Sequence, residues 1–433
     1  MASYYLKTFF TVLVSIIILV GTVNFVVDPF ELFPGPSIES FNAEKTEFHK
    51  HVLMTKAHAV RFFKPGAIIL GSSRAEYGLD PQHPAWDSLA RPVYNLGLPN
   101  GRIEEAFYYL KHAHAHGDLK QVVLGADFFM FGDQFRTNIN FNRNRLSEAN
   151  VDTIDTGWFK DIVNSLFTLD ATNASLDTIK SQGLGKSVLY LSNGMRSSKD
   201  TWKQVRAKGG HNQVFLSDIR HDLLFEAGLA AYTLGEAHNK PSPTLAIFSE
   251  FVQFCLEQGI ELKIIISPMH AYKLETLYYL DLWDLFEYWK RRLTTIVETE
   301  NQVNKRSIAA EIWDFSGYNS ITTEPVPSKD NPGLQMRWYW EGSHYRDEMG
   351  DKLLECVLGE VAPGECSIGL QLSTVNISDH LSKIRKAGSA YRKSNANDIK
   401  MLKSLIKETE QERNALRTRI GWQPEKLNRL ERQ

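Results

Sequence analysis

The stretch AIILGSSR at positions 67–74 decides the fold class. Its four apolar residues predict a short strand buried on both faces, and Gly71 predicts a sharp turn at the carboxyl end of that strand. A strand that turns directly into a helix leaves backbone N–H groups at the helix start, where they can stabilise a developing oxyanion. We therefore predict that Ser73 is a nucleophile. A phosphate-binding turn with Arg74 as a clamp is the competing interpretation, which the lack of a nucleotide glycine fingerprint disfavours.

The same pattern of strand, turn and helix recurs along the chain. Further strands are predicted at 93–95, 121–124, 261–267 and 308–315, and helices at 103–116, 243–258, 274–298 and 347–358. Short apolar strands separated by helices indicate a parallel sheet covered on both faces, and five such strands favour a doubly wound, flavodoxin-like α/β fold. Residues 131–239 interrupt the alternation, so we expect a long, partly helical insertion on the side where the strands end.

The N-terminus carries an uncharged apolar run from Phe9 to Val27. A helix of about 20 apolar residues crosses the hydrocarbon core of a bilayer. A cleaved signal peptide would have a shorter run and small residues at a cleavage site, so we predict an uncleaved signal anchor rather than a signal peptide or a buried core helix. Lys7 precedes the run, whereas Asp28 and Glu31 follow it. The positive-inside rule then predicts a single-pass protein of the cytoplasmic (inner) membrane whose main domain faces the periplasm or exterior.

Composition divides the chain into four segments. We expect a signal anchor at 1–28, an exit linker and lead-in at 29–60, the α/β domain at 61–366 and a basic helical tail at 367–433. From Asp379 to Gln433 there are 14 Lys or Arg residues against 7 Asp or Glu residues. Such a tail can bind anionic lipid or polymer, but a solvated terminal helix is the favoured interpretation.

The overall composition argues against several classes of function. The chain has 433 residues, of which 43% are hydrophobic and 23% charged, and its net charge of −2 gives no basic footprint for nucleic acid. Its three cysteines form no CxxC pair, so we expect no zinc site, no other metal and no cofactor. Cys356 and Cys366 are close enough to pair in an oxidising compartment, although two unrelated thiols explain them equally well.

Two glycine motifs end the second and third predicted strands. In Asn95-Leu96-Gly97, the glycine lets the backbone approach a substrate and offer its N–H group. In Gly125-Ala126-Asp127, a carboxylate reaches the same edge of the sheet, with capping of the next segment as its structural alternative.

A candidate base for Ser73 lies far along the chain, in WYWEGSH at 338–344. Serine is a poor nucleophile until a nearby group takes its proton, and an imidazole oriented by a carboxylate is the usual base. Glu341 lies three residues before His344, so a short loop can bring its carboxylate to the ring. We predict that His344 is the base and that Glu341 orients it.

This set of motifs resembles the SGNH hydrolase family over roughly residues 60 to 360. Gly71-Ser72-Ser73 is similar to the family's Gly-Asp-Ser block, Gly97 to its second-block glycine, and Glu341-Gly342-Ser343-His344 to its Asp-x-x-His block. Gly125-Ala126-Asp127 resembles Gly-x-Asn-Asp, with Asp127 in the place of the oxyanion asparagine. That departure matters, because an ionised carboxylate cannot donate a hydrogen bond to an oxyanion. The replacement of aspartate by Glu341 is milder.

The most similar subgroup is membrane-anchored and includes the D-alanyl transfer protein of teichoic acid and the alginate O-acetylation proteins. The resemblance implies acyl transfer or ester hydrolysis on an extracytoplasmic polysaccharide, with a membrane protein partner that supplies the acyl group. In this scheme the N–H groups of Ser73 and Gly97 stabilise the oxyanion, and the predicted assisting and substrate-binding residues are Asn95, Asn100, Arg74, Asp127, Trp338 and Trp340. The alternative is a non-catalytic subunit that binds or scaffolds an envelope polymer.

Overall fold

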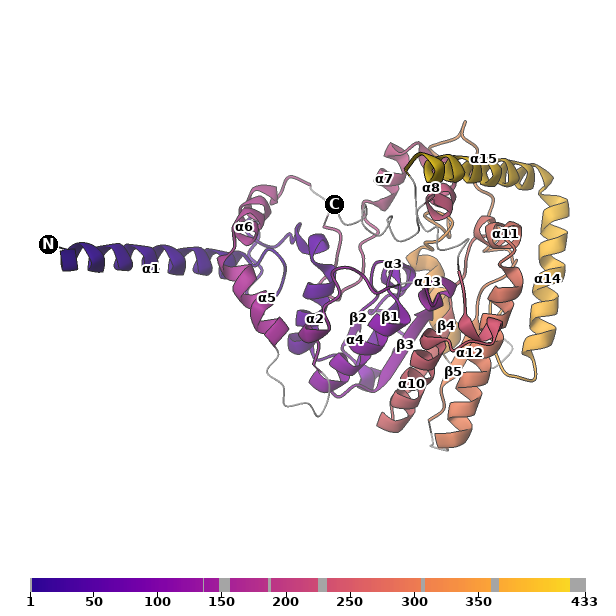
Figure 1. The fold of residues 1–433 in the computed structure, drawn as a ribbon, viewed down its shortest axis with the longest axis horizontal. Coiled ribbons are helices and arrows are strands. Elements are labelled where there is room, and N and C mark those ends of the chain that lie inside the picture. The colour runs from indigo at the N-terminus through magenta and orange to yellow at the C-terminus, as the bar shows by residue number, and fades with distance from the viewer. Residues whose placement is uncertain are drawn as a thin grey trace.

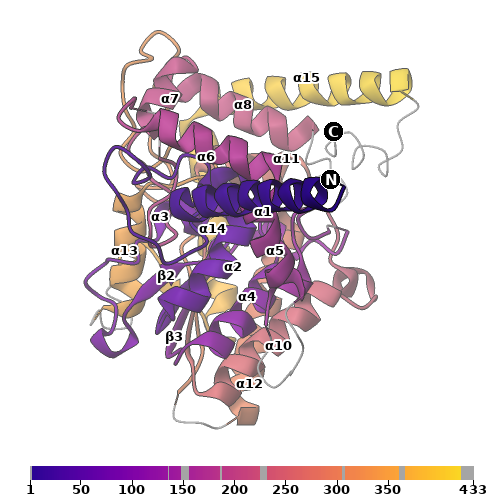
Figure 2. The ribbon, with the colours of Figure 1, turned by 90° about the vertical axis from the view of Figure 1, so that its left-hand side faces the viewer.

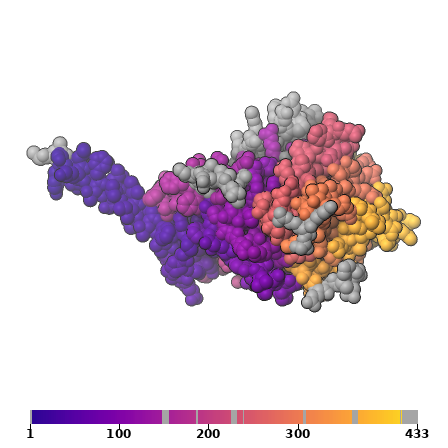
Figure 3. Space-filling view, turned by 90° about the horizontal axis from the view of Figure 1, so that it is seen from below, coloured from indigo at the N-terminus to yellow at the C-terminus, as the bar shows by residue number. Residues whose placement is uncertain are grey.

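A computed structural model of the chain describes residues 2–134, 136–147, 156–185, 188–224, 232–304, 308–359 and 366–420. Helix α1 (Ala2–Val27) projects from the body as a narrow stalk (Figures 1 and 3). Its residues Ser3–Val27 have a mean hydropathy of 2.5, and the helix is long and apolar enough to cross a membrane. The other elements form an α/β body.

The body is built on one six-stranded sheet with the strand order β2-β1-β3-β4-β5-β6. The strands are β1 (Ala67–Gly71), β2 (Val93–Asn95), β3 (Gln121–Ala126), β4 (Glu261–Ile266), β5 (Glu311–Asp314) and β6 (Leu370–Gln371). The first five are parallel and follow the 2-1-3-4-5 order of flavodoxin-like folds, which confirms the predicted doubly wound sheet. The sequence does not predict β6, which pairs antiparallel with β5 and is too short to give a periodic signal.

Alternate residues of the strands enter two apolar cores, one on each face of the sheet. On one face, Ile68 and Val122 pack in a core shared with α2 (Val52–Phe63), α4 (Ile103–His116), α10 (Pro243–Gln258) and α12 (Trp283–Asn304). On the other face, Ile69 and Val123 share a core with α3 (Ser73–Gly78), α8 (Gly210–Leu224) and α13 (Asp347–Leu358). Because both faces are covered, these strands consist mainly of apolar residues, which is why the sequence reveals them.

The predicted insertion is partly helical, as expected. It contains α5 (Thr156–Phe167), α6 (Leu169–Ser181), α7 (Thr201–Ala207), α8 and the short 3₁₀ turns Arg143–Arg145 and Gly235–His238. A further 3₁₀ turn, Phe128–Phe131, leads into it. Helices α5 and α6 pack against α1, whereas α8 packs against α15 (Ala396–Ile420) on another side of the body (Figures 1 and 2).

Three helices match their predicted bounds, but the helix predicted at 274–298 does not. It is two helices, α11 (Ala271–Tyr279) and α12, separated by a turn at Asp281 with φ of 56°. Aspartate tolerates this left-handed conformation, and the apolar pattern that runs through the turn conceals it.

The described part of the C-terminal segment, residues 366–420, is folded onto the body. Helices α14 (Ile377–Ser394) and α15 bury Leu381, Ile384 and Leu402 against other elements. At the start of this segment, Cys366 forms a disulfide with Cys356 at the end of α13, with the two Cα atoms 5.6 Å apart. The two cysteines are therefore a disulfide pair and not two unrelated thiols.

Candidate active site

The turn after β1 fixes the position of Ser73. Gly71 has φ of 141°, and a Cβ at this position would lie 2.7 Å from the carbonyl oxygen of Gly125 and 2.9 Å from Cβ of Ala75, so only glycine fits. Ser72 is the N-cap of α3, and its hydroxyl accepts a hydrogen bond from the N–H of Arg74 at 3.2 Å. Ser73 is thus the first residue of α3, and its own N–H has no hydrogen-bond partner within the described residues.

His344 is presented by a hairpin-like loop at 338–346. The N–H of Trp340 donates to the carbonyl of His344 at 2.9 Å, and the N–H of Arg346 donates to the carbonyl of Trp338 at 2.8 Å. At the tip of this loop, the Glu341 carboxylate accepts hydrogen bonds from the N–H groups of Ser343 at 2.7 Å and His344 at 3.0 Å. These bonds fold the Glu341 side chain back toward the imidazole, as the spacing of three residues predicts.

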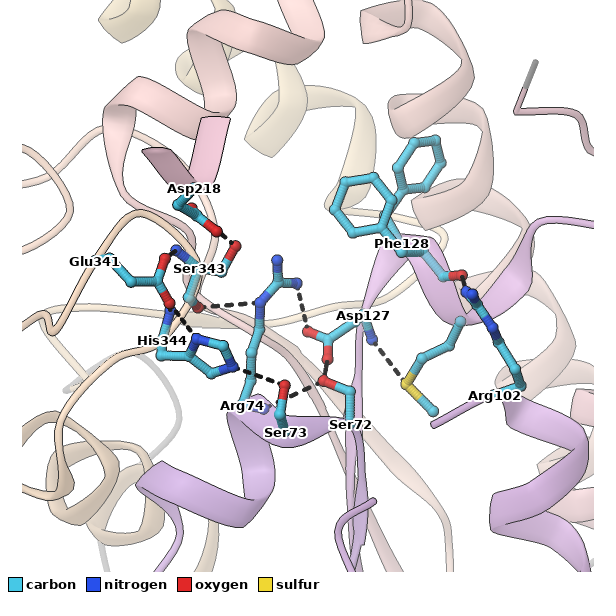
Figure 4. A network of polar contacts seen from close by, with 12 residues as sticks. Ser72, Ser73, Arg74, Arg102, Asp127, Phe128, Asp218, Glu341, Ser343 and His344 are labelled. Atoms are coloured by element: carbon cyan, nitrogen blue, oxygen red, sulfur yellow. Dashed lines mark hydrogen bonds and ion pairs between the residues drawn. The ribbon is translucent and has the colours of Figure 1, made fainter. Parts of the chain in front are cut away.

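The two segments bring Ser73, His344 and Glu341 together in one chain of contacts (Figure 4). Ser73 Oγ lies 2.7 Å from Nε2 of His344, and Nδ1 of the same ring contacts Oε1 of Glu341. We assign the ring proton to Nδ1, because the carboxylate can only accept, which leaves Nε2 free to accept the serine proton. The ring of Tyr77 lies 4.9 Å from the imidazole between centroids and covers one side of it.

Asp127, which follows β3, and Arg74 connect the Ser73 turn and the His344 loop to the sheet. Asp127 accepts from the hydroxyl of Ser72 and from Nη1 of Arg74, the latter at 2.8 Å (Figure 4). Arg74 also donates from Nε to the carbonyl of Ser343 at 3.0 Å. Although burial opposes its charge, Asp127 raises the pKa of Arg74 above its ordinary value. Asp127 therefore contacts both neighbours of Ser73, and Arg74 connects it to the histidine loop. Arg74 and Asp127, which the sequence predicts as substrate-binding residues, are both buried and form these internal contacts.

Behind Glu341 lies a cluster of charged residues that the sequence does not single out. Asp218 of α8 interacts with Glu341, and its Oδ2 lies 3.2 Å from Nζ of the buried Lys273 of α11. Lys273 also pairs with Asp222, one helical turn further along α8. Each residue lies within an ordinary helical pattern, and only the packing of α8 beside the loop makes the cluster.

The facing carboxyl groups of Asp218 and Glu341 have pKa values shifted in opposite directions. Burial and the neighbouring Glu341 raise the pKa of Asp218 to about 7. Burial also disfavours ionisation of Glu341, but its contacts with His344 outweigh this and hold the pKa of Glu341 well below its usual value. Burial lowers the pKa of Lys273. Glu341 is thus the ionised member beside the imidazole, as an orienting carboxylate must be.

Two of the other predicted oxyanion donors, Gly97 and Asn95, are occupied by hydrogen bonds within the protein. The N–H of Gly97 donates to Oδ1 of Asn95 at 2.9 Å, and Nδ2 of Asn95 donates to the carbonyls of Ala75 and Leu79 at 3.0 and 2.9 Å. Asn95 is fully buried, so it connects β2 to α3 instead of facing a substrate. Asn100 is exposed in the turn before α4, with φ of 53°. Within the described residues, the predicted donors that no internal hydrogen bond occupies are therefore the Ser73 N–H and the Asn100 side chain.

The two predicted stacking tryptophans differ. Trp340 is buried, and the Arg346 guanidinium lies 4.4 Å from its ring centroid, so it packs inside the protein and is not a surface for sugar. Trp338 is only partly buried, with Arg337 4.4 Å from its ring centroid, and stays a candidate.

Comparison with known proteins does not assign the site. No family model, curated protein or solved structure matches the chain. The described part of the chain contains no group of three or more His, Cys, Asp or Glu side chains arranged to hold a metal ion. The evidence for a reaction at this site is therefore the geometry of Ser73, His344 and Glu341.

Proposed function

We propose that the chain is an SGNH-type serine O-acyltransferase or esterase that acts on an extracytoplasmic polysaccharide or other envelope polymer. The observation that carries the proposal is the distance of 2.7 Å between Ser73 Oγ and His344 Nε2, with Glu341 on the opposite ring nitrogen. A serine hydroxyl, an imidazole and an ionised carboxylate in this order are the parts of a nucleophilic acyl-transfer site.

The reaction follows from these three side chains. Nε2 of His344 takes the hydroxyl proton as Ser73 Oγ bonds to the acyl carbon, and Glu341 stabilises the resulting imidazolium. The tetrahedral intermediate collapses when the departing alkoxide takes this proton, leaving an acyl group on Ser73. His344 then removes a proton from water or from a sugar hydroxyl, whose oxygen attacks the acyl carbon. His344 returns this proton to Ser73 Oγ as the bond between Oγ and the acyl carbon breaks. Water gives ester hydrolysis, and a sugar hydroxyl gives transfer.

The oxyanion site supports a second candidate function, a non-catalytic subunit that binds or scaffolds the polymer. The N–H of Gly97 is engaged in an internal hydrogen bond, and the Asp127 carboxylate cannot donate, so the Ser73 N–H has only Asn100 left among its predicted helpers. Loss of one oxyanion donor lowers turnover by about a hundredfold or more in a serine protease. A slow enzyme or an inactive relative of an enzyme both fit this deficit.

The compartment is also a proposal, and it rests on two features. α1 is long and apolar enough to cross a membrane, with a positive charge only before its apolar run. The disulfide between Cys356 and Cys366 is typical of an oxidising compartment. We infer that the α/β body lies on the outer side of the cytoplasmic membrane, with polymer and a membrane-bound acyl donor as partners. A reporter that is active only after export, fused after residue 433, should be active; activity of a cytoplasm-only reporter would reverse the assignment.

Covalent labelling with a fluorophosphonate probe tests the chemistry. We expect the wild-type protein to be labelled and the Ser73→Ala variant to remain unlabelled. Ser72→Ala is the matched control, because it removes the neighbouring hydroxyl and the helix cap but leaves the nucleophile in place. Equal labelling of wild type and Ser73→Ala, or no labelling of either, would favour the non-catalytic subunit.

A further inference from the structure

Helices α5 and α6 turn a small and polar face toward the protein. In α5, Gly157, Asp161 and Ser165 recur at every fourth position and are buried. Asp161 pairs there with Arg145 and lies 3.3 Å from the ring nitrogen of His58. In α6, the buried residues are Ala171, Ala174, Ser175, Thr178 and Ser181. Helices on the surface of a soluble protein normally bury their apolar face instead.

The opposite face of α5 carries an uncovered apolar stripe that continues to the first residue of α6. Phe159, Val163 and Phe167 are also four residues apart in α5, and they are 62%, 37% and 49% exposed. Leu169, at the start of α6, is 83% exposed. Contiguous exposed apolar residues of this size mark a surface that contacts another apolar phase.

This apolar stripe is continuous with α1. A Cβ at Gly21 would lie 2.6 Å from Cε1 of Phe167, so the last residue of the α5 stripe packs directly on the N-terminal helix. Asn24 of α1 is fully buried and donates from Nδ2 to the carbonyl of Leu166 at 2.8 Å and to Oγ1 of Thr172 at 3.1 Å. Ser175 in turn donates to Asn24 Oδ1 at 2.8 Å. The hairpin and the end of α1 are therefore joined by both apolar and polar contacts.

The level of these contacts along α1 locates the hairpin relative to a bilayer. Gly21 and Asn24 precede the first charged residue after the apolar run, Asp28, by seven and four positions. At 1.5 Å per residue they lie about 6–10 Å inside the end of the apolar segment. Amphipathic helices in the interface insert their apolar faces about 5–10 Å into the boundary between headgroups and acyl chains. Figure 1 shows α5 and α6 running across the direction of α1, on either side of its entry into the body.

We propose that the α5–α6 hairpin lies in the membrane interface, with Phe159, Val163, Phe167 and Leu169 among the lipid headgroups and acyl chains. Its occupant is the bilayer that α1 crosses. The small and polar inner face then packs on the protein, and the apolar stripe of α5 contacts lipid. The exposed polar residues of α6, among them Asp177 and Lys180, then lie at the level of the headgroups. The hairpin fixes the body against the membrane surface instead of leaving it on a free tether. This proposal depends on α1 crossing the bilayer and not on the chemistry proposed for Ser73.

The test is the depth of single fluorescent labels in the full-length protein, reconstituted in vesicles of phosphatidylcholine and phosphatidylglycerol. Phe159→Cys and Val163→Cys each introduce a reactive thiol, since Cys255 is buried and Cys356 and Cys366 are paired. Each is labelled with an environment-sensitive fluorophore. Val375→Cys is the matched control, since Val375 is 91% exposed and precedes α14, on the far side of the body from α1 (Figure 1). Ile17→Cys marks α1 itself.

We expect labels at 159 and 163 to be quenched by a nitroxide placed near the headgroup end of the lipid acyl chain, and to be severalfold less accessible to aqueous iodide than the label at 375. Both positions are exposed, so neither cysteine should disturb folding, and unchanged melting of each variant checks this. Quenching at 17 together with labels at 159 and 163 that behave like the label at 375 would overturn the proposal. Absence of lipid quenching at 17 would overturn it as well, because no span would hold the hairpin at the membrane.

Discussion

Replacing Asp127 by asparagine tests whether this carboxylate fixes the positions of the Ser73 turn and the His344 loop. Arg74 and Asp127 are 5% and 3% exposed, and Nη1 of Arg74 lies 2.8 Å from Oδ1 of Asp127. With charge centres about 4 Å apart and an effective dielectric constant of about 20, their attraction is about 4 kcal/mol. Removing one partner of a buried ion pair typically costs about 3–5 kcal/mol, because the other charge stays buried without compensation.

Asparagine keeps the shape of Asp127 and can still accept one hydrogen bond, and Arg74 retains its bond to the carbonyl of Ser343. We therefore expect Asp127→Asn to lower the free energy of unfolding by about 3 kcal/mol, toward the lower end of that range. Turnover should fall too, because Ser72 and Arg74, the neighbours of Ser73, lose a shared anchor.

Thermal melting in detergent and the rate of fluorophosphonate labelling measure the two effects. Asp118→Asn is the matched control, since Asp118 is exposed and paired with Lys120 at the surface, where such a pair contributes at most about 1 kcal/mol. The family resemblance gives the opposite expectation, because asparagine is the oxyanion donor that Asp127 replaces. An Asp127→Asn variant that melts like the wild type and is labelled faster would refute the role as an anchor.

Three further predictions concern the rest of the site and its support. Glu341→Gln should slow labelling by at least about a hundredfold with little change in melting temperature. The matching change in a serine protease lowers turnover by about ten-thousandfold, because it favours the wrong tautomer of the histidine. The loss is smaller here because a glutamine oxygen can still face the ring. Near-normal labelling with a lowered melting temperature would reduce Glu341 to a structural role. The stabilisation from protonated Asp218, whose pKa rises from 3.8 to about 7 on folding, is complete below about pH 4 and lost as the pH rises through 7. Asp218→Asn should abolish this decline between pH 4 and 8 in melting curves, and an unchanged profile would contradict it. Cys356→Ser opens the disulfide to Cys366, ten residues away, and should lower stability by about 3 kcal/mol, as should a reductant acting on the wild type; identical melting with and without reductant would contradict this.

The features that the sequence predicts well are those with a local cause. The five parallel strands are mainly apolar because both faces of the sheet are covered, and Gly71 is required because a Cβ there would meet both Gly125 and Ala75. Ser73 lies two residues after that glycine, and Glu341 lies three residues before His344. Short-range geometry alone therefore places Ser73 at the start of α3 and Glu341 next to the imidazole. Their meeting follows from parallel strand order, since active sites lie at the carboxyl ends of such strands.

The features that the sequence does not predict depend on which surfaces meet. Asp218 becomes a neighbour of Glu341 only because α8, from the insertion, packs beside the histidine loop. The N–H of Gly97 is taken by a side chain two residues away, a choice that a strand-end motif does not reveal. The turn at Asp281 is hidden in the same way, because apolar residues continue through it.

The insertion links the two parts of the protein on which the proposed function depends. At one end, α5 and α6 hold the last turns of α1 through Asn24. At the other, α8 braces the histidine loop: Nδ1 of His211 donates to the carbonyl of Trp340 at 3.0 Å, and Nε2 accepts from the N–H of Met336 at 3.0 Å. In the proposed arrangement, in which α1 crosses the bilayer, a segment that packs on both α1 and the loop of His344 restricts how the site can face the membrane. A site fixed in this way suits the proposed acyl transfer from a donor that is itself held in the membrane.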